Sequence, residues 1–483
     1  MSSGQAHRNR LAAHFRLDLL LGLTVPGQMS RLSTLRIIMP ISKQAERQGA
    51  ALRSHLGRSA LGELHKRNFD PLQILLQAAK RHIAQLVPIK FKLMSESPFV
   101  FFRGSVEIMA ADLGQARHTK IEVQMCGDAH VKNFGFFATP ASEIVLDIND
   151  FDETQRGPWE WDVKRLATSI ILAGRTAGDK EACCKEAVRV FVGDYCEWVR
   201  RFADMPAIEV ARHRIVRNLH DPVIHTALKK AERAGPLVSL CKLTHKTKNG
   251  YSFIYKQNSI WDVKGAESQA VVRALAAYRG TLAPDRQFLF DRYVVADVGF
   301  KVVGTGSVGT RDYVVLLLGK ESGDADPLFL QVKEEPPSAY AGYYKDRAAP
   351  GHQGERVVKG QRALQVYSDL LLGWCSIAGR DYLVRQLNDH KSAVEPEDLQ
   401  GERLIEYGRV CAELLAKGHA RSGDPAVLTA YLGRPGKAEK ALVQFALAYA
   451  EQVEADYEAF RKALKKSFVQ DAVKLADHVR IFR

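Results

Sequence analysis

The sequence predicts an α+β protein with two lobes, one helix-rich and one built on antiparallel strands. Apolar residues recur at helical spacing over 45–95 and again from 401 onwards, most clearly in DPLQILLQAAKRHIAQLV at 70–87. The region of about 250–395 instead carries runs rich in β-branched residues, such as FKVVGTGSVGTRDYVVLLLG at 300–319. A strand-rich region flanked by helix-rich regions is typical of an α+β organisation.

These changes of pattern set the expected boundaries. We expect a poorly ordered N-terminal extension at 1–44, a helical lobe at 45–240, a strand-rich lobe at 241–400, and C-terminal helices at 401–483 that complete the helical lobe. The first lobe also contains local strand signals, namely KIEVQM at 120–125 and the pair FGFFA and EIVLDI joined by TPAS. Further helices are predicted over 161–177, 180–203 and 354–374, and a further strand over 381–387.

Composition excludes several classes of protein. No apolar run reaches the roughly 18 residues of a membrane span, so no membrane span is expected. The seven cysteines are scattered without a CxxC pair, which favours a reduced, cytoplasmic protein. The net charge of +14 is spread along the chain without a Lys/Arg tract, so a nucleic-acid partner is not favoured, whereas a nucleotide or phosphorylated ligand is compatible.

The stretch MCGDAHVKNFGFFATPASEIVLDINDFDET at 125–154 carries the first candidate site. Asp128 and Asn133 follow a predicted strand, so one loop presents a carboxylate that can accept a proton and an amide oxygen that can bind Mg²⁺. The next strand ends in three further hard oxygen ligands, Asp147, Asp150 and Asp152, of which Asp150 is preferred because it closes the strand beside Phe151. Such residues also make ordinary turns and caps, but the whole cluster favours a functional site.

A glycine-rich segment and a lysine form the second candidate site. GTGSVG supplies Gly304, Gly306, Ser307 and Gly309, and the strand-like sequence after it argues against a dinucleotide-binding turn, which requires a helix. A glycine-rich hairpin lying over nucleotide phosphates fits better, because backbone N–H groups can then approach the phosphates. Lys333 lies on the next predicted strand, where it could pair with phosphates, and Glu355 on the following helix is its candidate partner. A single lysine on a strand is more often a solvent-exposed residue. The hypothesis of a phosphate-binding lysine therefore depends on the order of the glycine-rich segment, the hairpin and Lys333 in the sequence.

The motifs SPFVFFRGS, CGDAHVKNFG, DINDFDET, GPWEWDVKRLA, VGTGSVGTR, LVRQLND and HARSGD together resemble a bacterial family known as domain of unknown function 2252, over about 45–465. GDAHVKNF is also similar to the catalytic loops of aminoglycoside phosphotransferases and HipA-type protein-kinase-like proteins. This second resemblance implies a two-lobed kinase-like fold. In kinases, however, the glycine loop and the lysine precede the catalytic loop, so the fold would have to be circularly permuted.

The resulting functional hypothesis is an ATP-dependent, Mg²⁺-requiring phosphotransferase with an unknown acceptor. Asp128 would orient or deprotonate the acceptor, and His130 and Lys132 would offset the charge of the transferred group. Two alternatives remain open. One is a metal-dependent phosphohydrolase that recruits His352, His390 and His419, and the other is a non-catalytic nucleotide-binding protein.

Overall fold

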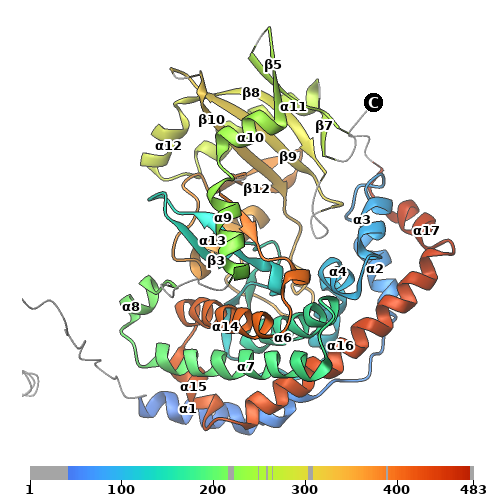
Figure 1. Ribbon diagram of the computed structural model, residues 1–483, viewed down its shortest axis with the longest axis vertical. Coiled ribbons are helices and arrows are strands. Elements are labelled where there is room, and N and C mark those ends of the chain that lie inside the picture. The colour runs from blue at the N-terminus through green and yellow to red at the C-terminus, as the bar shows by residue number, and fades with distance from the viewer. Residues whose placement is uncertain are drawn as a thin grey trace, which may run out of the picture. The chain divides into compact units, whose positions relative to one another are not determined.

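A six-stranded antiparallel sheet dominates the strand-rich part of the computed structural model (Figure 1). Its spatial order is β11-β12-β10-β9-β8-β7. The strands are β7 (Ile260–Asp262), β8 (Tyr293–Lys301), β9 (Asp312–Gly319), β10 (Gly323–Glu334), β11 (Gly373–Ile377) and β12 (Arg380–Gln386). Consecutive strands β8, β9 and β10 therefore form a meander, and β12 pairs with the free side of β10. This arrangement confirms the α+β class and the antiparallel strand-rich region.

The structure describes residues 42–478, apart from 216–221, 249, 257–258, 264, 303–307, 322 and 388–389. The described residues belong to one compact unit, Ile38–Arg483. The extension expected at 1–44 lies almost entirely outside the described residues, as do Gly304, Gly306 and Ser307 of the glycine-rich segment.

Helices form most of the remainder. Those before the sheet are α1 (Lys43–His55), α2 (Pro71–Ala79), α3 (Val87–Met94), α4 (Pro98–Gly104), α5 (Val106–Gln115), α6 (Trp159–Thr176), α7 (Glu181–Ala203), α8 (Ala207–Arg212), α9 (Pro222–Glu232) and α10 (Pro236–Leu243). Within or after the sheet lie α11 (Ala266–Arg279), α12 (Pro284–Phe290), α13 (Gln353–Leu364), α14 (Glu402–Ser422), α15 (Pro425–Leu432), α16 (Lys437–Leu464) and α17 (Phe468–Leu475). In Figure 1, α6, α7, α14 and α16 lie below the sheet, whereas α10, α11 and α12 lie beside it. The helices α14 and α16 pack on α6 and α7, so segments that precede and follow the sheet in the sequence build one helical layer.

Short strands connect the helical layer to the candidate site. β1 (Glu122–Met125) pairs with β4 (Gln155–Pro158), and β2 (Phe134–Ala138) and β3 (Ile144–Ile148) form the expected hairpin, joined at its edge by β13 (Ser392–Ala393). A second hairpin consists of β5 (Thr244–Thr247) and β6 (Gly250–Phe253). The β2–β3 hairpin was predictable from the sequence, because alternating apolar residues and a Thr-Pro turn are local signals.

Two predicted helices end earlier than expected. The segment 70–87 begins at its Asp70 N-cap but stops at Ala79, because the turn that follows is held by distant groups. The Ile83 N–H donates to the Gly309 carbonyl oxygen at 2.7 Å, and the Ala84 N–H to that of Asp477 at 2.9 Å. The helix expected over 354–374 ends at Leu364, because Gly373 and Trp374 pair with β12 as part of β11. Tertiary hydrogen bonds decided both boundaries.

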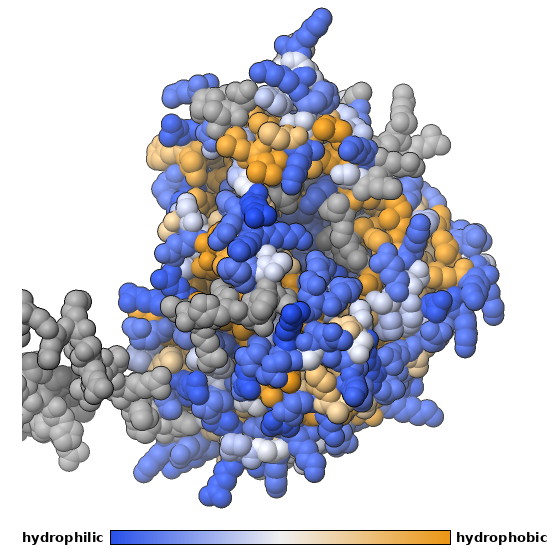
Figure 2. Space-filling model, viewed as in Figure 1, coloured by the Kyte–Doolittle hydropathy of each residue, from blue (hydrophilic) through white to orange (hydrophobic). Residues whose placement is uncertain are grey.

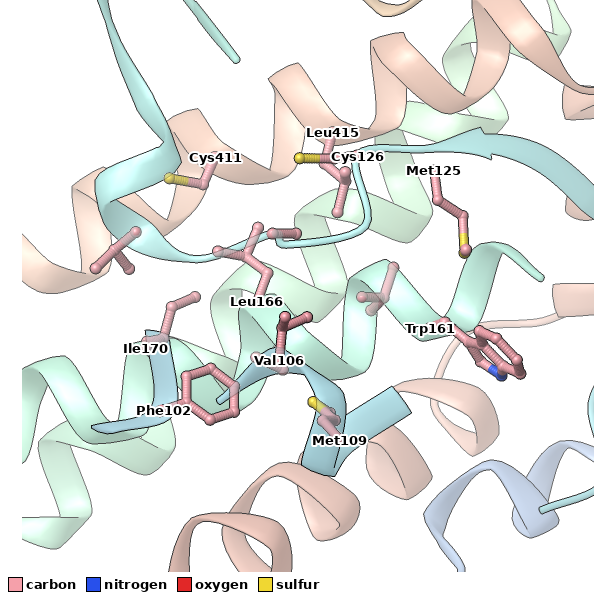
Figure 3. Packing of buried hydrophobic residues seen from close by; sticks show 14 of the residues in the cluster. Phe102, Val106, Met109, Met125, Cys126, Trp161, Leu166, Ile170, Cys411 and Leu415 are labelled. Carbon is pink, nitrogen blue, oxygen red and sulfur yellow. The ribbon is translucent and has the colours of Figure 1, made fainter. Parts of the chain in front are cut away.

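The main hydrophobic core surrounds α6 and encloses the loop that follows β1. Figure 3 shows Cys126 of this loop between Leu166 of α6 and Leu415 of α14, and all three side chains are buried. Phe102 and Val106 close the core on another side. A second core lies between the sheet and α11, and Ile83 and Leu86 contribute to it. The candidate catalytic loop is therefore fixed by packing on a rigid helix.

On the face shown in Figure 2, most of the visible surface is hydrophilic, and hydrophobic residues gather mainly over the strand-rich part and on the side of α3 and α17. None of the described helices combines the length and low charge that a membrane crossing requires.

A buried lysine of α6 gives a pH-dependent prediction. Lys164 is only 3% exposed, and its ammonium lies 4.2 Å from the Phe445 ring centroid. Burial lowers the pKa of Lys164 to about 8, although the negative charge of Glu160 acts to raise it. Between pH 8 and the ordinary lysine value of 10.5, the unfolded chain binds more protons, so the free energy of unfolding should rise with pH in that window. Lys164→Met should remove that rise and stabilise the protein at pH 7 by about 2 kcal/mol. Urea unfolding between pH 7 and 10 tests this, and an unchanged slope in the variant would contradict it.

Candidate active site

The loop after β1 is positioned by a buried aspartate of α6. Asp162 accepts hydrogen bonds from the backbone N–H groups of Cys126 at 2.6 Å and Gly127 at 2.9 Å, and the His419 ring nitrogen lies 3.2 Å from the same carboxylate. Gly127 has φ +86°, and a Cβ there would collide with the Glu153 carbonyl oxygen. Asp162 therefore anchors this loop to α6.

Asp128 follows directly and lies in a network of basic groups. Its carboxylate accepts a hydrogen bond from the guanidinium of Arg165 at 2.6 Å, and the His130 ring lies 3.6 Å from its other oxygen. Arg103 in turn donates to His130 at 3.3 Å. Burial raises the pKa of Asp128, and Arg165 opposes that shift. The result is a fixed carboxylate whose proton affinity exceeds that of a surface aspartate, which suits a general base.

Asn133 and Asp150 meet where the loop and the end of β3 come together. The Asn133 amide group donates to the carbonyl oxygens of Asp128 and Asp150, each at 3.0 Å, so its Oδ1 is turned away from these bonds. Among the described residues, neither Asn133 Oδ1 nor Asp150 Oδ1 has a hydrogen-bond partner, although both atoms are buried. Buried acceptor oxygens without donors suit a hard cation such as Mg²⁺.

Within the described part of the chain, no group of three or more His, Cys, Asp or Glu side chains is arranged as a metal site. Mg²⁺ at nucleotide sites commonly takes only one or two protein carboxylates, with water and phosphate oxygens completing its shell. Asn133 and Asp150 fit that smaller donor set.

Lys333 approaches the same place from the sheet. It lies on β10 opposite Asp312 of β9, its side chain is buried, and its ammonium forms an ion pair with Asp152. The attraction of Asp152 and Asp150 raises the pKa of Lys333 against the opposing effect of burial. Lys333 is therefore a fixed positive charge beside the aspartates.

A pocket brings these residues together. Its floor holds Asp128, Asp150, Asp152 and Glu153, and its sheet wall runs from Lys333 to Pro336. The segment from the end of α2 to α5 forms another part of the wall, and it carries Arg81, His82, Lys90, Arg103 and Glu107. Gly309 is near this wall, has φ +122°, and would place a Cβ 2.7 Å from the His82 ring. Lys333, the predicted base Asp128 and two of the predicted metal ligands, Asp150 and Asp152, thus line one cavity, although about 200 positions of sequence separate the lysine from the aspartates.

Other predicted residues lie in different surroundings. Asp147 forms a buried ion pair with Lys417 of α14, and Lys132 forms an ion pair with Glu395. Glu355 pairs with Lys359 on its own helix at 2.7 Å, so the acidic partner of Lys333 in this structure is Asp152.

The three histidines of the phosphohydrolase hypothesis do not line the pocket. His419 contacts Asp162 and Tyr195, His352 contacts Asp381 and the N-terminus of α13, and His390 contacts the Ala231 carbonyl oxygen.

Comparison with known proteins adds a family. The model of a family described as "uncharacterized protein conserved in bacteria" (DUF2252) matches residues 81–463. The chain belongs to this family. No curated protein and no solved structure shows significant similarity to this chain. The DUF2252 match spans every residue of the pocket, from Arg81 to Pro336.

Sequence reasoning missed three groups of this DUF2252 site. Arg165 and Arg103 occur in GPWEWDVKRLA and SPFVFFRGS, two of the motifs that carried the family resemblance, so a charged residue inside a long motif was the available signal. Glu335 follows Lys333 by two positions on an extended backbone, which directs both side chains to one face.

Proposed function

We propose that the protein is a kinase-like phosphotransferase that transfers the γ-phosphoryl group of ATP, with Mg²⁺, to an acceptor. The observation that carries this proposal is that Lys333 and the aspartates Asp128 and Asp150 line one pocket. A lysine for phosphates, a base for the acceptor hydroxyl and a metal-binding carboxylate are the parts that phosphoryl transfer requires.

The order of elements supports a kinase-like arrangement within each part of the chain. A glycine-rich connection joins β8 to β9, a lysine lies on β10, and a helix, α13, precedes the last two strands. Protein kinases use a glycine-rich loop, a lysine on the third strand and a following helix in the same way. In the helical part, Asp128, Asn133, a hairpin and Asp150 occur in the order of a kinase catalytic loop and metal aspartate.

The reversed chain order fits a circular permutation. The catalytic-loop segment precedes the sheet in sequence, yet both line the same pocket. The C-terminal helices α14 and α16 then return to pack on α6 and α7. Spatial arrangement, rather than chain order, decides whether such a site can work.

The proposed chemistry follows from these positions. The acceptor oxygen forms a bond to the γ-phosphorus, the bond from that phosphorus to the β–γ bridging oxygen breaks, and ADP leaves with the released electron pair. Asp128 accepts the proton of the acceptor hydroxyl, and Arg103, which donates to the His130 ring beside it, supplies positive charge near the transferred group. Lys333 offsets phosphate charge once it exchanges Asp152 for phosphate oxygens. Mg²⁺ held by Asn133 and Asp150 would neutralise charge on the phosphates.

A nucleotide-binding role without transfer is the second candidate. It is favoured by one observation: the Asp128 carboxylate is already paired with Arg165, whose side chain is fully buried. In that case ATP should bind, and no turnover should depend on Asp128.

Thermal unfolding with and without Mg²⁺-ATP tests the proposal, followed by measurement of γ-phosphate transfer or release. A ligand present at 100 times its Kd should stabilise the folded chain by about 2.7 kcal/mol. Lys333→Met should weaken this stabilisation, whereas Lys320→Met, a variant of an exposed lysine in the turn after β9, should not. Absence of stabilisation of the parent protein by Mg²⁺-ATP would overturn both the transferase and the nucleotide-binding candidates.

A further inference from the structure

We infer that Glu335, together with Asp152, forms a second divalent-cation subsite in the pocket, beside the one proposed at Asn133 and Asp150. This subsite does not depend on nucleotide or on phosphoryl transfer. The basis for this subsite is the environment of one buried carboxylate, that of Glu335.

The Glu335 carboxylate is buried and lacks donors. The residue is 2% exposed and lines the pocket, and neither carboxylate oxygen has a hydrogen-bond partner among the described residues. Its backbone is fixed, because its N–H donates to the Asp381 carbonyl oxygen at 2.8 Å beside the edge of β12. A carboxylate without donors in such a place is costly unless it is protonated or paired with a cation.

The neighbouring basic side chains form their ion pairs and hydrogen bonds with other groups. Lys333 is paired with Asp152. Arg356 of α13 donates to the carbonyl oxygens of Thr154 at 2.6 Å and Pro336 at 2.9 Å, and to the side chain of Gln353 at 2.7 Å. Burial, with the charge of Asp152, raises the pKa of Glu335 well above its usual range. Neither Lys333 nor Arg356 donates a hydrogen bond to the Glu335 carboxylate, so both of its oxygens remain open to a cation in the pocket.

Asp152 supplies the second carboxylate. One of its oxygens binds Lys333, and the other, Oδ1, is buried without a partner. Asp152 and Glu335 arrive from different elements, the end of the β3 segment and the end of β10, and both line the cavity. Acceptor-only oxygen atoms select hard cations such as Mg²⁺ and Mn²⁺, which keep several waters when the protein provides few ligands.

Binding of Mn²⁺ to the full-length protein without nucleotide, followed by electron paramagnetic resonance and calorimetry, tests the inference. The parent should bind two ions, and Glu335→Gln should bind one. Asp150→Asn should also bind one, by loss of the other subsite. Glu321→Gln, at an exposed glutamate in the turn between β9 and β10, is the matched control and should bind two.

Thermal unfolding separates loss of a ligand from loss of the fold. In metal-free buffer Glu335→Gln should unfold at the parent's temperature or above, because it removes a buried ionisable group, and only the parent should gain the full stabilisation by Mn²⁺. Equal stoichiometry in the parent and Glu335→Gln would overturn the inference, as would a parent that binds no Mn²⁺. If the parent protein binds two Mn²⁺ ions but is not stabilised by ATP, the second subsite is supported and the proposed function is contradicted.

Discussion

Asp128→Asn is expected to lower the rate of γ-phosphoryl transfer by about 10²–10⁴-fold, the range usual for loss of a general base. The amide keeps an oxygen that can accept the hydrogen bond from Arg165, which lies 2.6 Å from the Asp128 carboxylate, but it cannot take a proton from the acceptor. Stabilisation by Mg²⁺-ATP should persist, because the predicted metal ligands Asn133 and Asp150 are unchanged. Single-turnover transfer and nucleotide-dependent thermal unfolding measure the two effects separately.

The comparison needs a control for charge and for folding. Asp194→Asn removes a carboxylate from α7, where it pairs with Arg409 at 3.0 Å, and should leave transfer unchanged. Because Arg165 is fully buried, Asp128→Asn should also reduce stability, so Asp128→Asn/Arg165→Met provides a variant without the unpaired cation. Transfer that survives in folded Asp128→Asn would assign the base to another residue, whereas a parent protein that ATP stabilises but that shows no transfer would favour the binding-only candidate.

Local patterns predicted the parts of the site, and distant contacts decided how they join. The loop at 127–133, the β2–β3 hairpin and the strand carrying Lys333 were visible from alternation, turn residues and spacing. The partner of Lys333 was not, because Asp152 lies 181 positions away and only the packing of the sheet on the helical layer brings the two together. The same limit explains why Glu355 was expected as that partner although it pairs with Lys359.

Three aspartates lie at one strand end in the sequence, with Asp150 preferred as the metal ligand, and the fold gives each of them a different environment. Asp150 keeps an unpartnered buried oxygen, Asp152 pairs with the sheet lysine, and Asp147 pairs with a lysine of α14. The alternation of side chains along a strand explains part of this difference between the aspartates. Asp147 belongs to β3 itself, where its neighbours are covered by helices. The choice of Lys417 as its partner depends on a helix 270 positions away, so no local signal could reveal it.

Asp147→Ala is therefore expected to destabilise the fold rather than to weaken metal binding. Asp147 and Lys417 are 6% and 1% exposed, so removal of the aspartate leaves an uncompensated buried ammonium. Loss of one partner of a buried ion pair typically costs about 3–5 kcal/mol. Urea unfolding should show this loss, while the number of Mn²⁺ ions bound by the folded protein should stay the same.

A double variant distinguishes the pair from the cavity that alanine creates. Asp147→Leu/Lys417→Met replaces both charges with apolar side chains and should recover most of the lost free energy of unfolding, because replacing a whole buried pair is often neutral. Glu186→Ala, which breaks the exposed pair with Arg189, should cost less than about 1 kcal/mol. A loss of bound Mn²⁺ in folded Asp147→Ala would instead place Asp147 among the metal ligands, and the ion pair with Lys417 would then be an arrangement that the cation replaces.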